Sequence, residues 1–199
     1  MVINNSNNKK GFTLIEIIIV ISVISILLPT IFATVYMIVQ QQLRIYRITE
    51  TKRQGDYVST VMKELISREV IGFQDDAGLP LCFTSGSSAT AVDGSNFNFI
   101  ASPVAPSTNN QLFGFIRTGS TIQLEIGTVI APAAITTDLT NTRVAVTNFI
   151  IACNKKSDST LPLVAYEFDI LFIDSTPTNS EGIVSLHYQS KVKIRRTAN

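Results

Sequence analysis

The sequence is poor in the side chains that most catalytic and metal sites require. Its 199 residues include one histidine, His187, two cysteines, Cys82 and Cys153, and no tryptophan. One histidine and two distant cysteines cannot complete a four-ligand zinc site without several carboxylates. The G-x-S-x-G elbow of many hydrolases is also absent. The sequence therefore predicts that the protein is not an enzyme and holds no cofactor.

Charged residues are few and nearly balanced. Only 16% of the residues are charged, and 16 basic side chains against 15 acidic ones give a formal net charge of +1. A nucleic-acid partner would require a clustered basic excess, so the sequence offers no evidence for one. The mean hydropathy of +0.28 is high for a soluble domain of this size. The composition therefore indicates a membrane.

The apolar residues concentrate near the N-terminus. Between Phe12 and Val39 the only charged residue is Glu16, and Ile17–Val39 is an uncharged run of 23 residues. A helix of that length spans about 35 Å, and a bilayer core requires about 20 residues. A cleavable secretory signal would have a shorter apolar region followed by a small-x-small site, which the residues around Ala33 do not offer. The run therefore predicts a transmembrane helix that stays attached to the mature chain.

Glu16 is unusual because a carboxylate inside a membrane segment is costly, by about 2.5 to 3.5 kcal/mol on insertion scales. No lysine, arginine or histidine lies between Phe12 and Val39 to neutralise it. Cleavage of the chain just before Phe12 would create a cationic amine one helical turn away. That amine could pair with Glu16 of the same chain or of a neighbouring copy.

This junction resembles the leader junction of type IV pilins and type II secretion pseudopilins, in which a short basic leader ending in glycine precedes a long apolar helix. The resemblance rests on the residues Lys9, Lys10, Gly11, Phe12, Thr13, Leu14, Ile15 and Glu16, with Lys9 and Lys10 as the basic part of the leader. It implies that a prepilin peptidase cuts between Gly11 and Phe12 and that the new Phe12 amine is methylated. It also implies that Glu16 pairs with the Phe12 amine of an adjacent subunit during filament assembly.

The resemblance implies a structural subunit of a type IV pilus-like or type II secretion-like filament. Such a subunit is held in the inner membrane by one span, with a cytoplasmic N-terminus and an extracytoplasmic head, and later enters the pilus or pseudopilus. Its implied partners are the prepilin peptidase, other pilin or pseudopilin subunits, the inner-membrane assembly platform and membrane lipid. The size of the chain and its long head favour a minor pilin or minor pseudopilin. The alternative is an uncleaved, membrane-anchored binding or receptor domain.

The basic residues that follow the apolar run argue for the opposite orientation. They are Arg44, Arg47, Lys52 and Arg53, and only Glu50 offsets them. Basic residues near the ends of a span favour the cytoplasmic side, and this group outnumbers Lys9 and Lys10. Charge alone would therefore place the C-terminal part in the cytoplasm. The leader motif requires a cytoplasmic N-terminus instead, and we give it the greater weight.

Beyond the span, apolar residues continue at helical spacing to about Gly72, although Gly55 interrupts the middle. This apolar stripe consists of Val58, Val61, Met62, Leu65 and Ile66. The expected organisation is a leader peptide over residues 1–11, a transmembrane and assembly helix over 12–39, an amphipathic continuation over 40–72 and a β-rich globular head over 73–199.

Short alternating apolar runs predict strands in the head. The residues expected to share one face of each strand are Val184, Leu186, Tyr188, Val192 and Ile194; Val164, Tyr166, Phe168, Ile170 and Phe172; Ile122, Leu124 and Ile126; Val144, Val146, Ile150 and Ala152; and, with a weaker signal, Phe97 with Phe99 and Phe113 with Phe115. Thr84–Asn96 and Ala101–Gln111 are expected to be exposed loops. We therefore expect an α+β fold, in which a long N-terminal helix continues into a head with an antiparallel sheet packed on its C-terminal half, as in pilins.

The two cysteines leave two alternatives open. If the head lies outside the cytoplasm, Cys82 and Cys153 could form a disulfide, which would stabilise the fold by about 4 kcal/mol in the chain-entropy model. They could equally be two buried free thiols, because sequence does not show whether they are close. Some pseudopilins bind calcium in the head, so the resemblance leaves calcium open, although Asp75-Asp76 and Asp93–Asn96 lack the spacing of a calcium loop.

Overall fold

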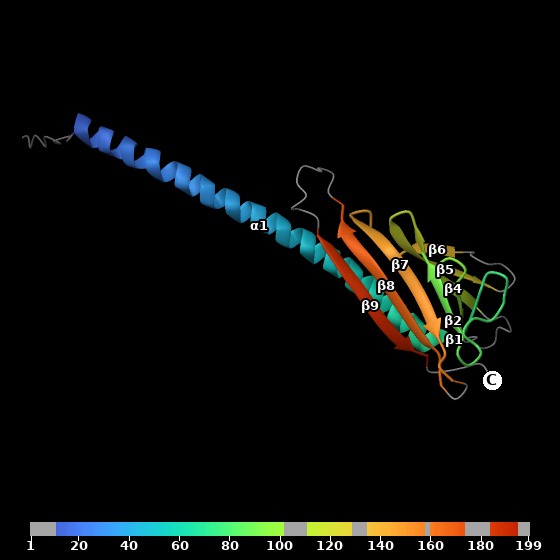
Figure 1. Cartoon of the computed structure of the whole chain (residues 1–199). Helices are drawn as coiled ribbons and strands as arrows, with labels where there is room; N and C mark the ends of the chain where they lie inside the picture. The colour runs from blue at the N-terminus through green and yellow to red at the C-terminus, as the bar shows by residue number, and fades with distance from the viewer. Residues whose placement is uncertain (1–10, 102–110, 129–134, 158–159, 174–183, 195–199) are drawn as a thin grey trace, which may run out of the picture. The chain divides into compact units, whose positions relative to one another are not determined.

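A computed structural model describes residues 11–101, 111–128, 135–157, 160–173 and 184–194 (Figure 1). Within these ranges the protein has one α-helix followed by nine β-strands. The chain divides into two compact units, Met1–Ile45 and Tyr46–Asn199. The basic leader residues Lys9 and Lys10 lie outside the described residues.

The helix α1 runs from Leu14 to Glu69 without a break, although it contains Pro29 and Gly55. Its N-terminal part is exposed, and by length and composition it could cross a membrane. Four serine and threonine hydroxyl groups in this part donate to carbonyl oxygens of the preceding helical turn; they belong to Ser22, Ser25, Thr30 and Thr34. Since a bilayer core offers no water to polar groups, this internal bonding suits a membrane segment.

Two antiparallel sheets form the rest of the second unit. The first has the order β1-β3-β4-β5-β6, and the second has the order β2-β7-β8-β9. The strands are β1 (Val70–Gln74), β2 (Ser88–Val92), β3 (Asn98–Ala101), β4 (Gln111–Thr118), β5 (Thr121–Thr128), β6 (Ile135–Asp138), β7 (Val144–Asn154), β8 (Leu163–Phe172) and β9 (Ser185–Lys193). The predicted α+β class, with a long N-terminal helix and an antiparallel head, is confirmed, and the head contains two sheets where one was expected.

The C-terminal half of α1 and both sheets share one hydrophobic core. The helix contributes Val58, Met62 and Ile66, which have no exposed surface, and Val61 and Leu65 pack at the margin. The first sheet brings a cluster of phenylalanine rings with centroids 5.1 to 5.8 Å apart, formed by Phe73, Phe97, Phe99, Phe113 and Phe115. The predicted apolar stripe on α1 is therefore the face that the head covers.

The predicted strands were found, but three others were missed. The first, β1, begins at Val70, so α1 ends three residues before the expected stop at Gly72. The second, β2, lies within Thr84–Asn96, which was wrongly expected to be a loop; it pairs with β7 at the edge of its sheet. The third is β6. All three are only four or five residues long, too short to show a clear period of two. Most of Ala101–Gln111 lies outside the described residues.

A β-bulge in β7 overturns the face predicted for that strand. The pairing with β8 shifts register between Thr147 and Ile150, and Asn148 has a positive φ of 52°. The extra residue reverses the alternation, since a shift of one position moves side chains to the other face. Ile150 and Ala152 therefore do not share the face of Val144 and Val146. The residues buried in their place are Phe149, Ile151 and Cys153.

Gly55 lies where a tyrosine ring from β9 presses against the helix. A Cβ atom at Gly55 would lie 2.2 Å from the Tyr188 ring. That ring stacks on Phe168 with centroids 5.1 Å apart, and its hydroxyl donates to Asp56 Oδ1 at 3.0 Å. Burial, together with the neighbouring Asp56 carboxylate, raises the pKa of Tyr188 to about 12. The glycine that weakened the helix prediction is thus required by close packing.

Replacing Gly55 should destabilise the protein although alanine favours helices. For Gly55→Ala we expect the free energy of unfolding to fall by about 1 to 3 kcal/mol, as at other overpacked sites. Urea unfolding of the detergent-solubilised full chain measures this. In a Tyr188→Leu background the same change should cost little, because the clash partner is gone. An equal cost in both backgrounds would contradict the packing explanation.

Candidate functional site

The start of α1 is closed by reciprocal hydrogen bonds between Thr13 and Glu16. The backbone N–H and the hydroxyl of Thr13 each donate to Glu16 Oε2 at 3.0 Å. In return, the backbone N–H of Glu16 lies 3.4 Å from the Thr13 hydroxyl. This is a capping box, which satisfies donors that a helix N-terminus otherwise leaves unpaired. The Glu16 carboxylate therefore already has partners within its own chain.

Gly11 and Phe12 precede the first turn of the helix and are both exposed. Phe12 has 82% of its surface exposed. A Cβ atom at Gly11 would meet no atom within 4 Å. The peptide bond between them thus lies in an open segment directly before a capped helix, so a side chain at position 11 would not disturb the described structure.

Residues 6–28 match the family model described as the prokaryotic N-terminal methylation motif. The matched segment contains Gly11, Phe12 and Glu16 and runs into the apolar part of α1. The motif, together with the apolar helix that it opens, fits a type IV pilin-like protein. No curated protein and no solved structure matches the chain significantly.

The capping box was missed at the level of sequence although its signal is present. Thr13 and Glu16 stand in the spacing of an S/T-x-x-E motif directly before an apolar helical run. The sequence argument assigned Glu16 an amine as its partner. The structure adds a second role for the same carboxylate, because it also holds the first turn of α1 together.

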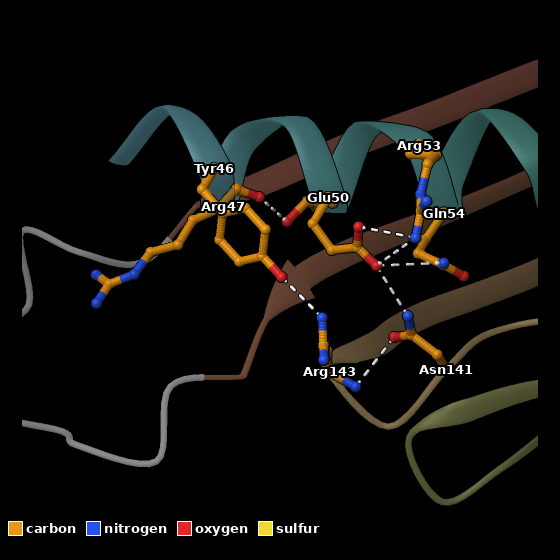
Figure 2. Close-up of polar contacts among 8 residues, drawn as sticks. Tyr46, Arg47, Glu50, Arg53, Gln54, Asn141 and Arg143 are labelled. Atoms are coloured by element: carbon orange, nitrogen blue, oxygen red, sulfur yellow. Dashed lines mark hydrogen bonds and ion pairs between the residues drawn. The ribbon is translucent and has the colours of Figure 1, made fainter. Parts of the chain in front are cut away.

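A second polar cluster lies where α1 enters the head, around the carboxylate of Glu50 (Figure 2). Glu50 is only 6% exposed. Its carboxylate forms an ion pair with Arg53 at 3.0 Å and accepts a hydrogen bond from Asn141 Nδ2 at 2.9 Å. Gln54 lies at 3.4 Å from the same group. The carboxylate is thus satisfied by the helix and by the turn between β6 and β7.

The turn between β6 and β7 holds the helix at two places. Besides the bond from Asn141 to Glu50, Arg143 Nη1 donates to the Tyr46 hydroxyl at 2.7 Å. The backbone N–H of Arg143 donates to Asn141 Oδ1 at 3.0 Å, which orients the Asn141 side chain toward Glu50. These partners are 91 and 97 positions apart in the sequence. No local motif could have paired them.

The surroundings of Glu50 favour its charged form. Burial on its own would raise the pKa, but the hydrogen bond from Asn141 and the hydrogen bond and charge of Arg53 outweigh it, so the pKa of Glu50 lies below its usual range. A carboxylate with a lowered pKa stabilises the fold above the unfolded pKa, and this stabilisation is lost as the pH falls through the folded pKa. The cluster should therefore weaken in acid.

Cys82 and Cys153 are joined by a disulfide, with their Cα atoms 6.2 Å apart. Both residues are buried, and the bond links the segment before β2 to the end of β7. Cys153 faces the core because the bulge in β7 reverses the alternation before it. The sequence left a disulfide and two free thiols as alternatives, and the structure contains the disulfide.

The carboxylates of Asp75, Asp76 and Asp93, which are potential calcium ligands, have partners within the protein. Asp75 Oδ1 accepts a backbone N–H, Asp76 Oδ1 accepts from Asn98 at 2.7 Å, and Asp93 Oδ1 pairs with Arg117 Nε at 2.7 Å. The hydrogen bond from Arg117 lowers the pKa of Asp93. Among the described residues, no group of three or more His, Cys, Asp or Glu side chains is arranged to hold a metal ion.

The single histidine lies on the solvent face of the second sheet. His187 Nδ1 lies 2.7 Å from Asp169 Oδ1, and Asn148 Nδ2 donates to the other oxygen of the carboxylate at 2.6 Å. The bonds from Asn148 and then from His187 lower the pKa of Asp169. His187 is exposed, as expected, but it has a carboxylate partner that the sequence argument did not foresee.

Removing the charge of Glu50 should alter the acid stability of the head. For Glu50→Gln we expect a loss of about 1 to 3 kcal/mol at neutral pH, because hydrogen bonds to a charged group are lost. We also expect a smaller fall in stability below about pH 4.5, since the titrating group is gone. Urea unfolding of the full chain across this range measures both. Glu64→Gln, which breaks only the exposed pair with Arg68, is the matched control and should change little. An unaltered acid slope in Glu50→Gln would contradict the assignment.

Proposed function

We propose that this chain is a structural subunit, a minor pilin or minor pseudopilin, of a type IV pilus-like or type II secretion-like filament. The observation that carries the proposal is the methylation motif at residues 6–28, which lies at the start of an exposed apolar helix followed by an α+β head. The exposed helix supports it, because an apolar surface of this size requires either a bilayer or neighbouring helices to cover it.

The proposed maturation begins with a prepilin peptidase that cuts between Gly11 and Phe12. The open segment before the capped helix supports this step, because the peptide bond is accessible. The new Phe12 amine is then methylated and remains cationic. Neither step requires a cofactor held by this chain, and we propose no enzymatic activity for it.

In assembly, Glu16 pairs with the Phe12 amine of an adjacent subunit. In the single chain, the carboxylate accepts its hydrogen bonds from Thr13, which are neutral donors. A cationic amine is a stronger partner for a carboxylate than a neutral donor. Breaking a buried pair by removing one member costs about 3 to 5 kcal/mol, so the contact also fixes the register between neighbouring helices.

We place the subunit in the inner membrane as a single-pass protein, with its N-terminus in the cytoplasm and its head outside, until an assembly platform transfers it to the filament. The disulfide in the head supports this orientation, since disulfides persist outside the reducing cytoplasm.

An uncleaved, membrane-anchored binding domain is the second candidate, and the capping box favours it. Thr13 gives Glu16 hydrogen-bond partners without any new amine, so the carboxylate does not by itself require cleavage. Under this proposal α1 would be a permanent anchor, and the leader would remain attached to it.

Processing decides between the two candidates. Intact mass and N-terminal peptide mapping of the protein from its native membrane should show a chain that begins at N-methylated Phe12. Replacing Gly11 with a bulky residue, as in Gly11→Leu, should leave an uncut precursor in the same membrane. A wild-type chain that keeps its leader in cells with an active prepilin peptidase would support the anchored domain.

The charge of Glu16 can be separated from its role in the helix cap. Glu16→Ala removes both, whereas Glu16→Gln keeps a capping side chain and loses only the charge. We expect both variants to insert into the membrane normally and to be depleted from filaments, at least tenfold, since loss of the pair costs about 3 to 5 kcal/mol. Immunoblots of sheared filaments and of membranes measure this. Normal incorporation of Glu16→Gln would show that Glu16 acts only as a cap.

A further inference from the structure

One end of the second unit carries aromatic, apolar and basic side chains together. We call this surface the rim; it consists of Tyr46, Arg143, Phe172 and Ile173. Tyr46 is the first residue of the unit and lies on α1, Arg143 comes from the turn before β7, and the other two come from the end of β8 and the position after it. Three segments that are distant in the sequence therefore contribute to one small surface.

The rim is held together by contacts among its own members. Arg143 Nη1 donates to the Tyr46 hydroxyl at 2.7 Å, and the backbone N–H of Ile173 donates to the Arg143 carbonyl at 2.9 Å. The rings of Tyr46 and Phe172 meet edge to face, with centroids 6.4 Å apart. The geometry of the surface is thus fixed before anything binds to it.

The rim is also open to solvent. Tyr46 is 48% exposed and Ile173 is 40% exposed, and Arg143 is exposed as well. Figure 2 shows the nearby Glu50 carboxylate, which is engaged by Arg53 and Asn141. The Glu50 carboxylate is therefore occupied by other partners.

The place of the rim in the chain indicates what it meets. Tyr46 follows Val39, the last residue of the apolar run, by seven positions, or about two helical turns. The polar headgroup layer begins where the apolar part of a span ends. Tyrosine is enriched in that layer, and basic residues near it attract anionic lipids. The planar guanidinium of arginine also matches the geometry of a phosphate group.

We propose that the rim binds the phosphate-bearing headgroups of anionic phospholipids in the bilayer that holds the apolar helix. The inference rests on the membrane anchoring in the proposed function, but not on filament assembly. Tyr46 and Ile173 lie in the interfacial layer, while Arg143 pairs with lipid phosphate. The fold thereby adds Arg143 to the basic residues that follow the span, from 97 positions away.

The test uses the full chain reconstituted into nanodiscs of phosphatidylcholine with a minority of phosphatidylglycerol. After transfer to mild detergent, mass spectrometry measures which lipid the protein retains. We expect phosphatidylglycerol to be enriched by the wild type. For Arg143→Gln the enrichment should fall about fivefold, the effect expected for one basic residue near an anionic surface.

Two control variants separate charge at the rim from other causes. Arg143→Lys keeps the positive charge at position 143, and it should lose less of the enrichment than Arg143→Gln. Lys191→Gln removes one exposed charge on β9, near the opposite end of β8, and it should also behave as the wild type.

Equal retention of both lipids by the wild type would overturn the proposal. A loss in Lys191→Gln as large as in Arg143→Gln would overturn it too, because it would show a general effect of net charge. A loss of the same size in Arg143→Lys would also overturn it, because it would show that packing, and not charge, controls retention. A chain that does not enter the nanodisc at all would instead overturn the membrane anchor on which the proposed function depends.

Discussion

The structure depends on one uninterrupted helix whose two halves must satisfy their polar groups in different ways. In the N-terminal half of α1, hydroxyl groups and the Glu16 carboxylate bond within the helix itself. In the C-terminal half, the helix meets polar side chains from the head, such as Tyr166, whose hydroxyl donates to the Ser59 carbonyl at 2.8 Å. A helix segment whose polar groups form hydrogen bonds within the helix suits an apolar surrounding. A segment whose polar groups bond to side chains of the head requires the head to be folded.

The two acidic residues at the boundaries of these halves illustrate the difference. Glu16 finds its partners three positions away, through a motif that any isolated chain could form. Glu50 needs Asn141, which only the folded head brings to it. Loss of the partner therefore has different consequences for the two residues. For Glu16 it affects only the first turn of the helix. For Glu50 it leaves a buried carboxylate without its partner, which destabilises the whole unit.

The same difference explains what could be predicted from the sequence. Strict alternation identified β8 and β9 with their buried faces, and helical spacing identified Val58, Met62 and Ile66 as core residues. The face of β7 was predicted wrongly because the bulge at Asn148 reverses the alternation, and its effect shows only in the pairing with β8. Gly55 appeared as a weakness of the helix because its partner, the Tyr188 ring, is distant in the sequence. Features set by neighbouring residues could be predicted, whereas features set by pairings between distant segments could not.

This division also accounts for where the family signal lies. The methylation motif is matched over residues 6–28, where the recognisable features are local: the Gly11-Phe12 pair, a capping box and an apolar run. In the head, many arrangements of short strands can bury the same stripe of α1, and a core tolerates exchange of apolar residues if volume and pattern are kept. The junction is therefore recognisable from particular residues, whereas the head is specified mainly by its pattern of buried positions.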